Sequence, residues 1–213
     1  ENPTLLSTIL DGQSGADTLS EARRVEVVGN YAYVTGGDSG FNEYGLQIID
    51  VSDPANPTGV GSIQDGAPGA ANFGQPLATV ISGNYAFIGA ASDNAIQVID
   101  ISDPTNPTGV SSLVHNGTTI LLDSPANIVK RGNYLYVTSF VGDSLQVIDA
   151  SDPTNLVALG NISDGTGGAT ELDGANGLVI RGSYAYVSSE IDNGLQVVDI
   201  SDPNNLAGVA VLQ

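Results

Sequence analysis

Two acidic, glycine-rich segments hold the side chains best suited to chemistry. They read DGQSGAD at residues 11–17 and DGTGGATELDG at residues 164–174. Hard cations such as Ca²⁺ prefer six to eight oxygen ligands, and loops of this composition supply carboxylates and backbone carbonyls together. The sequence therefore suggests Ca²⁺ as its one candidate cofactor, although neither segment has EF-hand spacing. The candidate metal ligands are Asp11, Asp17, Asp164, Glu171 and Asp173.

Acid–base catalysis is the second chemistry that these carboxylates could perform. Glu171 and Asp173 stand two residues apart and could act as an acid–base pair on a glycan. Nucleophilic catalysis has no sequence signature, because the chain contains no cysteine and its single histidine, His115, has no nucleophile at a suggestive spacing. No glycine-rich segment opens a helix that could cradle a phosphate.

The charge balance of the chain excludes two classes of partner. Its 24 acidic residues outnumber five basic ones, which gives a formal net charge of −19. A phosphate backbone or an anionic membrane surface would be repelled, so we expect no nucleic-acid partner and no membrane insertion. No apolar run approaches the roughly 20 residues of a membrane helix. Because the chain starts at Glu1 and lacks methionine, we expect a processed or partial chain.

Four copies of one motif supply the elements that must position these side chains. Each copy has a Gly-Asn or Gly-Ser step before an aromatic run, and later a glutamine-containing run that ends in Ser-Asp-Pro. The Ser-Asp-Pro steps begin at Ser52, Ser102, Ser151 and Ser201, which gives periods of 50, 49 and 50 residues. Periods of this size mark solenoids, propellers and arrays.

Each copy predicts four short antiparallel strands. The Gly-Asn or Gly-Ser step separates two β-rich runs by two residues, which is a hairpin signal. Tyr134 and Tyr136 illustrate the aromatic residues at alternate positions, which share one face and should pack against a neighbouring unit. In Asp-x-Ser-Asp-Pro, Asp and Ser bond the backbone locally and Pro ends the strand. Four-stranded units at this period are β-propeller blades, so the predicted fold class is an all-β propeller.

The motif resembles the LVIVD repeat, a propeller-blade motif of bacterial and archaeal cell-surface and secreted proteins. GNYAYV at residues 29–34 and GLQIIDVSDPANPTGVGSI at residues 45–63 carry the resemblance, and in-phase copies cover essentially the whole chain. The resemblance implies a β-propeller and a secreted or cell-surface location. It implies no catalytic motif that could be transferred residue by residue.

The strand count leaves one strand too many for a closed four-bladed ring. We expect one propeller region, residues 1–213, and residues 1–10 match the outer strand of a preceding or closing blade. This surplus strand competes for one edge with the strand at residues 204–213. The chain is then a section of a larger ring, a four-bladed domain with one loose strand, a pair with a second copy, or a protomer whose surplus strand docks on the next molecule. The four blade repeats are expected at about residues 11–63, 64–114, 115–162 and 163–213.

Propeller connectivity sorts the charges onto two faces. Fourteen carboxylates, including Asp38 and Glu43, fall in loops on one face, and the eight of Asp-x-Ser-Asp-Pro fall on the other. Arg131 and Arg181 end their strands near the second face and are expected to pair with its acids. His115 aligns with Leu10, Gln64 and Ser163, which is typical of a tolerated loop substitution. The loops at residues 36–45 and 114–127 depart most from the repeat.

These observations predict a non-catalytic, secreted or cell-surface propeller that serves as a structural or interaction module. The expected partners are a protein or a glycan at the acidic loop face, with self-association through strand complementation as a further option. Two alternatives stay open. A Ca²⁺-dependent carbohydrate-binding domain would be sensitive to chelators, and a polysaccharide-acting enzyme would need one pocket that differs from its symmetry mates.

Overall fold

The computed structural model describes residues 4–37 and 44–212, and these residues form sixteen strands in four sheets. The first sheet contains β1 (Arg24–Val28), β2 (Tyr31–Gly36), β3 (Gly45–Asp50) and β4 (Thr58–Gln64). The second contains β5 (Pro76–Ser82), β6 (Tyr85–Ala90), β7 (Ala95–Asp100) and β8 (Thr108–Val114). The third contains β9 (Pro125–Arg131), β10 (Tyr134–Ser139), β11 (Ser144–Asp149) and β12 (Val157–Ser163). The fourth contains β13 (Ala175–Arg181), β14 (Tyr184–Ser189), β15 (Gly194–Asp199) and β16 (Ala207–Leu212).

Each sheet is one blade, and its four antiparallel strands follow chain order from the inside outward. The predicted hairpin turn forms in every blade, because a glycine with φ between 57° and 59° allows a two-residue connection between the first and second strands. The register places Val28 opposite Tyr31 in the first blade and Arg131 opposite Tyr134 in the third. These blades confirm the predicted all-β propeller fold.

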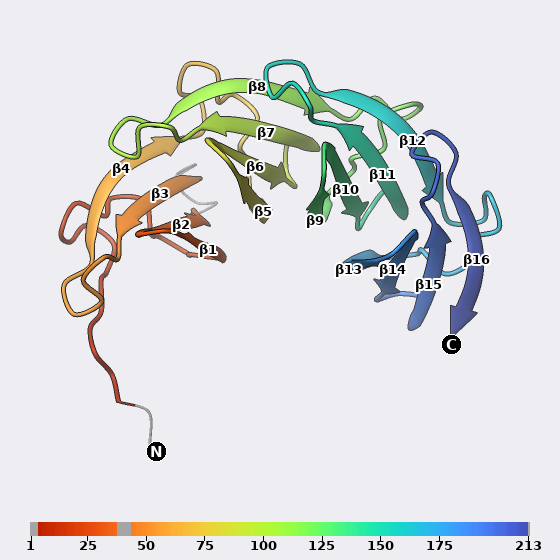
Figure 1. The fold of residues 1–213 in the computed structure, drawn as a ribbon, viewed down its shortest axis with the longest axis horizontal. Coiled ribbons are helices and arrows are strands. Elements are labelled where there is room, and N and C mark those ends of the chain that lie inside the picture. Colours follow the sequence, from red (N-terminus) through yellow and green to blue (C-terminus); the bar gives the residue numbers. More distant parts are fainter. Residues whose placement is uncertain (1–3, 38–43, 213) are drawn as a thin grey trace.

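The blades fan out as an open arc (Figure 1). The innermost strands β1, β5, β9 and β13 line its concave side, and each contacts the innermost strand of the next blade. The first and last blades stand at the two ends of the arc. In the part of the chain that the structure describes, no helix is long and apolar enough to cross a membrane.

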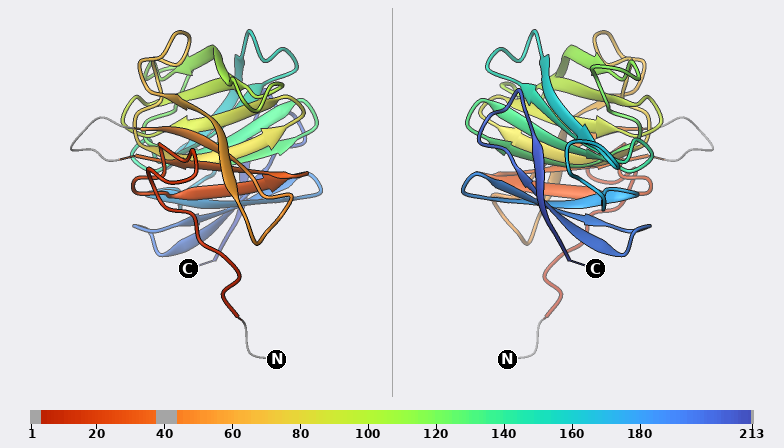
Figure 2. Two further views of the ribbon diagram at one scale, coloured as in Figure 1. Left: turned by 90° about the vertical axis from the view of Figure 1, so that its left-hand side faces the viewer. Right: turned by 90° about the vertical axis from the view of Figure 1, so that its right-hand side faces the viewer.

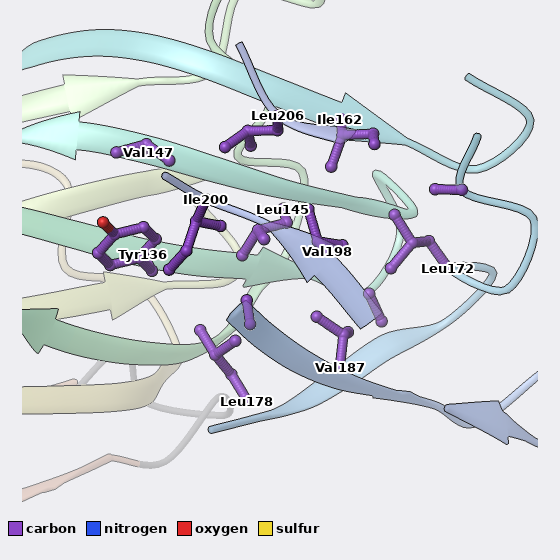
Figure 3. Close-up of a cluster of buried hydrophobic side chains, with 13 residues drawn as sticks. Tyr136, Leu145, Val147, Ile162, Leu172, Leu178, Val187, Val198, Ile200 and Leu206 are labelled. Carbon is purple, nitrogen blue, oxygen red and sulfur yellow. The ribbon is translucent and has the colours of Figure 1, made fainter. Parts of the chain in front are cut away.

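Apolar side chains fill the spaces between consecutive blades. Figure 3 shows the cluster between the third and fourth blades, where Tyr136 and Leu145 of the third blade meet Leu178 and Val198 of the fourth. Similar clusters join the first blade to the second and the second to the third. The aromatic residues at alternate positions therefore pack against the next blade, as the strand period predicted.

A fully buried glutamine joins the third strand of each blade to the outer strand and to the incoming loop. In the second blade, Nε2 of Gln97 donates hydrogen bonds to the carbonyl oxygens of Gly69 and Ser111, both at 2.8 Å. Its Oε1 accepts a hydrogen bond from the Asn72 N–H at 3.3 Å. The other three glutamines of this set have comparable bonds, and they are Gln47, Gln146 and Gln196. Burying this amide is tolerated because its donors and acceptor are satisfied.

The N-terminal segment, residues 4–10, takes the place of an outer strand but forms no strand in the structure. Oγ of Ser7 donates to the Pro54 carbonyl at 2.6 Å, and Oγ of Ser111 in β8 donates to the equivalent Pro153 carbonyl at 2.7 Å. Segment 4–10 therefore lies against the first blade as β8 lies against the third. It lacks a neighbouring third strand with which to form a ladder, and Figure 2 shows it extending beyond the blades.

Candidate functional site

The predicted Ca²⁺ ligands fall in two loops at opposite ends of the arc. Oδ1 of Asp11 accepts the Leu19 N–H at 2.7 Å before the first blade, and Oδ1 of Asp164 accepts the Leu172 N–H at 3.1 Å before the fourth. Asp17 shares the first loop, whereas Glu171 and Asp173 share the second. Among residues 4–37 and 44–212, no three acidic or histidine side chains are grouped so that they could hold a metal. The structure therefore does not unite the five residues in one site.

His115 has a different place in the repeat from the one predicted. Its Nδ1 accepts the Leu122 N–H at 3.0 Å, as Oδ1 of Asp65 accepts the Phe73 N–H at 3.2 Å in the preceding blade. His115 is thus equivalent to Asp11, Asp65 and Asp164. The loop after it is one residue shorter, which displaced the sequence alignment by one position.

The expected ion pairs of Arg131 and Arg181 with the Asp-x-Ser-Asp-Pro acids do not form. In the described residues, the single ion pair joins Arg23 to Glu21 at 2.7 Å. The Asp-x-Ser-Asp-Pro acids instead bond the backbone locally, as predicted: Oδ1 of Asp50 accepts the Ser52 N–H at 2.8 Å. The hydrogen bonds from Ser52 hold the pKa of Asp50 below its usual range.

A carboxyl cluster that the sequence did not predict lies between the third and fourth blades. Oδ1 of Asp143 accepts the Gly174 N–H at 2.9 Å, and Oδ2 of Asp192 accepts the Asp173 N–H at 2.8 Å. These bonds hold Asp143 and Asp192 close to Asp173. Partial burial raises the pKa of Asp173, and repulsion by Asp143 and Asp192 raises it further. Asp173 is therefore a stronger base than an isolated aspartate. Of the five candidate metal ligands, Asp173 belongs to this cluster, and Asp164 adds a smaller repulsion to it.

We expect Asp173→Asn to stabilise the protein near neutral pH. Because the pKa of Asp173 is raised on folding, ionisation is less favourable in the folded than in the unfolded chain, and stability is lost as pH rises through that pKa. Asparagine carries no charge there and can still donate a hydrogen bond to Asp143. The melting temperature of the variant should therefore exceed that of the wild type at pH 7, and the difference should disappear below the ordinary carboxyl pKa of about 3.9. Asp123→Asn, at the same loop position in the third blade, is the matched control.

The basic residues are concentrated on the strands that line the concave side. Four of the five lie on innermost strands: Arg24 on β1, Lys130 and Arg131 on β9, and Arg181 on β13; Arg23 immediately precedes β1. These strands contain one acidic residue, Glu26. The innermost strands, which form the inner wall of the arc, thus carry more basic than acidic residues, whereas the whole chain has a net charge of −19.

A hollow of about 230 Å³ lies across β1, β5 and β9 on this inner wall. It is lined by Arg24, Glu26, Thr79 and Asn127, together with Val25, Ala78, Ala126 and Ile128. Nε of Arg24 donates to the Leu77 carbonyl at 2.6 Å, and Oε2 of Glu26 accepts the Ile81 N–H at 2.8 Å. Both side chains of β1 are thereby held along the edge of β5.

This hollow departs from the repeat, as a specific site would. Counted back from the hairpin glycine, Arg24 is equivalent to Ala78, Asn127 and Gly177. In the same count, Glu26 is equivalent to Val80, Val129 and Val179. A larger hollow of about 550 Å³, lined by Arg131, Tyr134, Tyr136 and Ser201, lies between the third and fourth blades. Its walls are mostly repeat residues, so we regard the hollow around Arg24 as the candidate site.

The signal that could have located this site is the strand position of the basic residues. Arg24 and Glu26 stand where the other copies have small or apolar residues. An aligned set of repeats shows this difference without a structure. Their arrangement beside Thr79 and Asn127 depends on contacts between three blades, and the sequence of one blade does not encode those contacts.

Solved structures similar to this chain include proteins named as lactonases. A proposed 6-phosphogluconolactonase from Bacteroides uniformis matches with 16% identity and a TM-score of 0.68, covering 88% of this chain and 55% of that one. The periplasmic gluconolactonase of Pseudomonas aeruginosa matches with 15% identity and a TM-score of 0.65, covering 85% of this chain and 54% of that one. A functionally unknown protein from Desulfotomaculum acetoxidans matches with 17% identity and a TM-score of 0.67, covering 89% of this chain and 55% of that one. This chain thus spans little more than half the length of these proteins.

These matches correct the predicted function. A non-catalytic structural or interaction module does not follow from the repeat, because structures of the same fold include proteins named as lactonases. The repeat describes the blade scaffold, whereas activity depends on side chains that a few blades add to it. At these identities the likeness shows the fold alone, so it leaves open whether this chain is an enzyme.

Comparison with curated protein sequences finds no match. The family model of the LVIVD repeat matches four segments, and they are residues 20–65, 78–114, 126–164 and 174–210. Each segment covers most or all of one blade, and together they cover most of the chain. The chain therefore belongs to the LVIVD repeat family.

Proposed function

We propose that this chain forms the ligand-binding side of a propeller that hydrolyses the lactone of a sugar acid. The observation that carries the proposal is the concentration of basic residues on the innermost strands of an otherwise acidic chain. A wall of this kind favours a small anionic ligand over a neutral one. The lactonase names of the structural neighbours support the choice of substrate class.

The candidate site offers suitable groups for a sugar acid. Arg24 keeps four N–H donors beyond the Nε bond to Leu77, and a guanidinium recognises a carboxylate or phosphate through paired hydrogen bonds. The Thr79 hydroxyl and the Asn127 amide line the same hollow and can bond sugar hydroxyls. Glu26 provides an acceptor beside them.

Hydrolysis needs a base, and Asp173 is the best candidate. Arg24 begins β1 of the first blade, and Asp173 lies two residues before β13 of the fourth, so both residues stand where an innermost strand begins, although their blades lie at opposite ends of the arc (Figure 1). In the proposed reaction, water attacks the lactone carbonyl carbon while Asp173 accepts its proton. The ring C–O bond then breaks, and the proton passes to the ring oxygen to give the open hydroxy acid. The raised pKa of Asp173 suits this role.

Titration calorimetry with 6-phosphogluconate tests the binding step. We expect measurable binding by the wild type, and at least about tenfold weaker binding by Arg24→Gln because a charge-assisted hydrogen bond is lost. Arg23→Gln is the matched control, since Arg23 pairs with Glu21 and does not line the hollow. Glucose serves as the uncharged ligand. Equal affinity for glucose, or equal losses in the two arginine variants, would contradict the proposal.

Hydrolysis of gluconolactone, followed in a pH-stat against the uncatalysed rate, tests the chemical step. The wild type should exceed the background rate, and Asp173→Asn should return it to background while binding of 6-phosphogluconate is retained. Wild-type activity no greater than background would rule out hydrolysis by this chain, whatever the result of the binding experiment.

A further inference from the structure

The two ends of the arc carry the two halves of one blade-to-blade interface. Within the chain, Val129, Tyr134 and Leu159 of the third blade pack against the apolar cluster that it shares with the fourth. The equivalent residues of the fourth blade are Val179, Tyr184 and Val209. They are 65%, 42% and 53% exposed, because no further blade covers them.

The first blade carries the complementary half of the interface. Ala32, Val34 and Ile49 form a small buried cluster, and their equivalents in the fourth blade pack against the third. Here the cluster is covered by Ile9 and Leu19 of the N-terminal region instead of by a preceding blade. Val25 on the same strand face is 62% exposed.

We propose that a second copy of this chain docks its first blade on the exposed face of the fourth, so that two copies close an eight-bladed ring. The argument rests on continuity, because the same contacts join consecutive blades three times within the chain. Asn193 on the fourth blade supports the same docking. The equivalent residues of the second and third blades, Asn94 and Asp143, accept a backbone N–H of the next blade, from Ser124 at 2.8 Å and from Gly174 at 2.9 Å. Eight blades lie within the range of known propellers. This inference is independent of the proposed lactone hydrolysis.

Segment 4–10 competes with this docking. It occupies the position against the first blade that β16 of the incoming copy must take. β16 pairs with β15 in a ladder that begins with Leu195 opposite Leu212 and ends with Asp199 opposite Ala207. Segment 4–10 has no strand pairing. Docking of the second copy therefore displaces the segment. The cost of breaking the contacts of the segment with the first blade raises the dissociation constant of the dimer.

Light scattering across a range of protein concentrations tests the docking. We expect the mass of the wild type to rise from 21.6 kDa to twice that value and then to stay constant. Val209→Asp should abolish the rise, because it places a charge in the proposed interface. Val157→Asp is the matched control, since Val157 is an exposed valine on the outer strand of an internal blade. Circular dichroism of both variants checks that each is folded.

Ile9→Asp tests the competing segment. It should release segment 4–10 from the first blade and lower the dissociation constant of the dimer at least tenfold. Leu5→Asp, at a position 83% exposed, should leave the constant unchanged. A wild type and an Ile9→Asp variant that both remain monomeric would overturn the proposal. Growth beyond two copies, or association that survives Val209→Asp, would overturn it as well.

Discussion

Replacing Gln97 by leucine should lower the free energy of unfolding by about 3 kcal/mol or more. Leucine fills a similar volume but removes the hydrogen bonds to Gly69, Ser111 and Asn72. Each buried backbone group left without a partner costs about 1–3 kcal/mol. Because these groups belong to the outer strand and to the incoming loop, the loss should affect the whole second blade.

Urea denaturation of Gln97→Leu measures this loss. Gln64→Leu is the matched control, because Gln64 is exposed at the end of β4 and its replacement should change stability by less than about 0.5 kcal/mol. A loss below about 1 kcal/mol for Gln97→Leu would show that the buried amide is not the junction that the hydrogen bonds indicate.

Replacing Gly109 by alanine is expected to cost about 3 kcal/mol. A Cβ atom at Gly109 would lie 2.1 Å from the carbonyl carbon of Gly69, and backbone atoms cannot move aside as the end of a flexible side chain can. Overpacking of this kind typically costs 1–3 kcal/mol, and a backbone clash stands at the upper end of that range.

The third blade supplies the matched control for this substitution. Its equivalent residue is already an alanine, Ala158, and the loop that faces it is the shortened one after His115. Ala158→Gly should therefore change stability by no more than about 1 kcal/mol. The two melting temperatures, compared in the same buffer, check the contrast. Similar losses for Gly109→Ala and Ala158→Gly would contradict the close-contact explanation.

The sequence predicted those features of the fold that depend on residues close together in the chain. The Gly-Asn hairpins, the aromatic faces and the Asp-x-Ser-Asp-Pro turns all lie within a few residues of one another. The bond from Ser7 to Pro54 matches the one from Ser111 to Pro153, so the match of residues 1–10 to an outer strand holds for this contact. What the repeat could not predict is that segment 4–10 lacks a ladder, since a ladder depends on a partner strand outside the repeat.

The candidate site was largely beyond prediction, because it depends on contacts between blades. Asp143 and Asp173 come from different blades, and Gly174 brings them together through one hydrogen bond. Arg24 of the first blade and Asn127 of the third line the same hollow, with the second blade between them. The predicted place of His115 in the repeat was wrong for a local reason. The loop after His115 is one residue shorter than in the other repeats, and this shifts the apparent alignment of the repeats by one position. The loop containing residues 38–43, including Asp38 and Glu43, lies outside the described residues.

The serial arrangement of the apolar clusters has a consequence for how the protein unfolds. Each internal blade shares a cluster with a neighbour on both sides, whereas the first blade has a substantial cluster on one side and only the small group of Ala32, Val34 and Ile49 on the other. Stability in such nearest-neighbour systems is a sum of local and interface contributions. We therefore expect unfolding to proceed inward from the ends, and amide protons of the middle blades to exchange more slowly than those of the first.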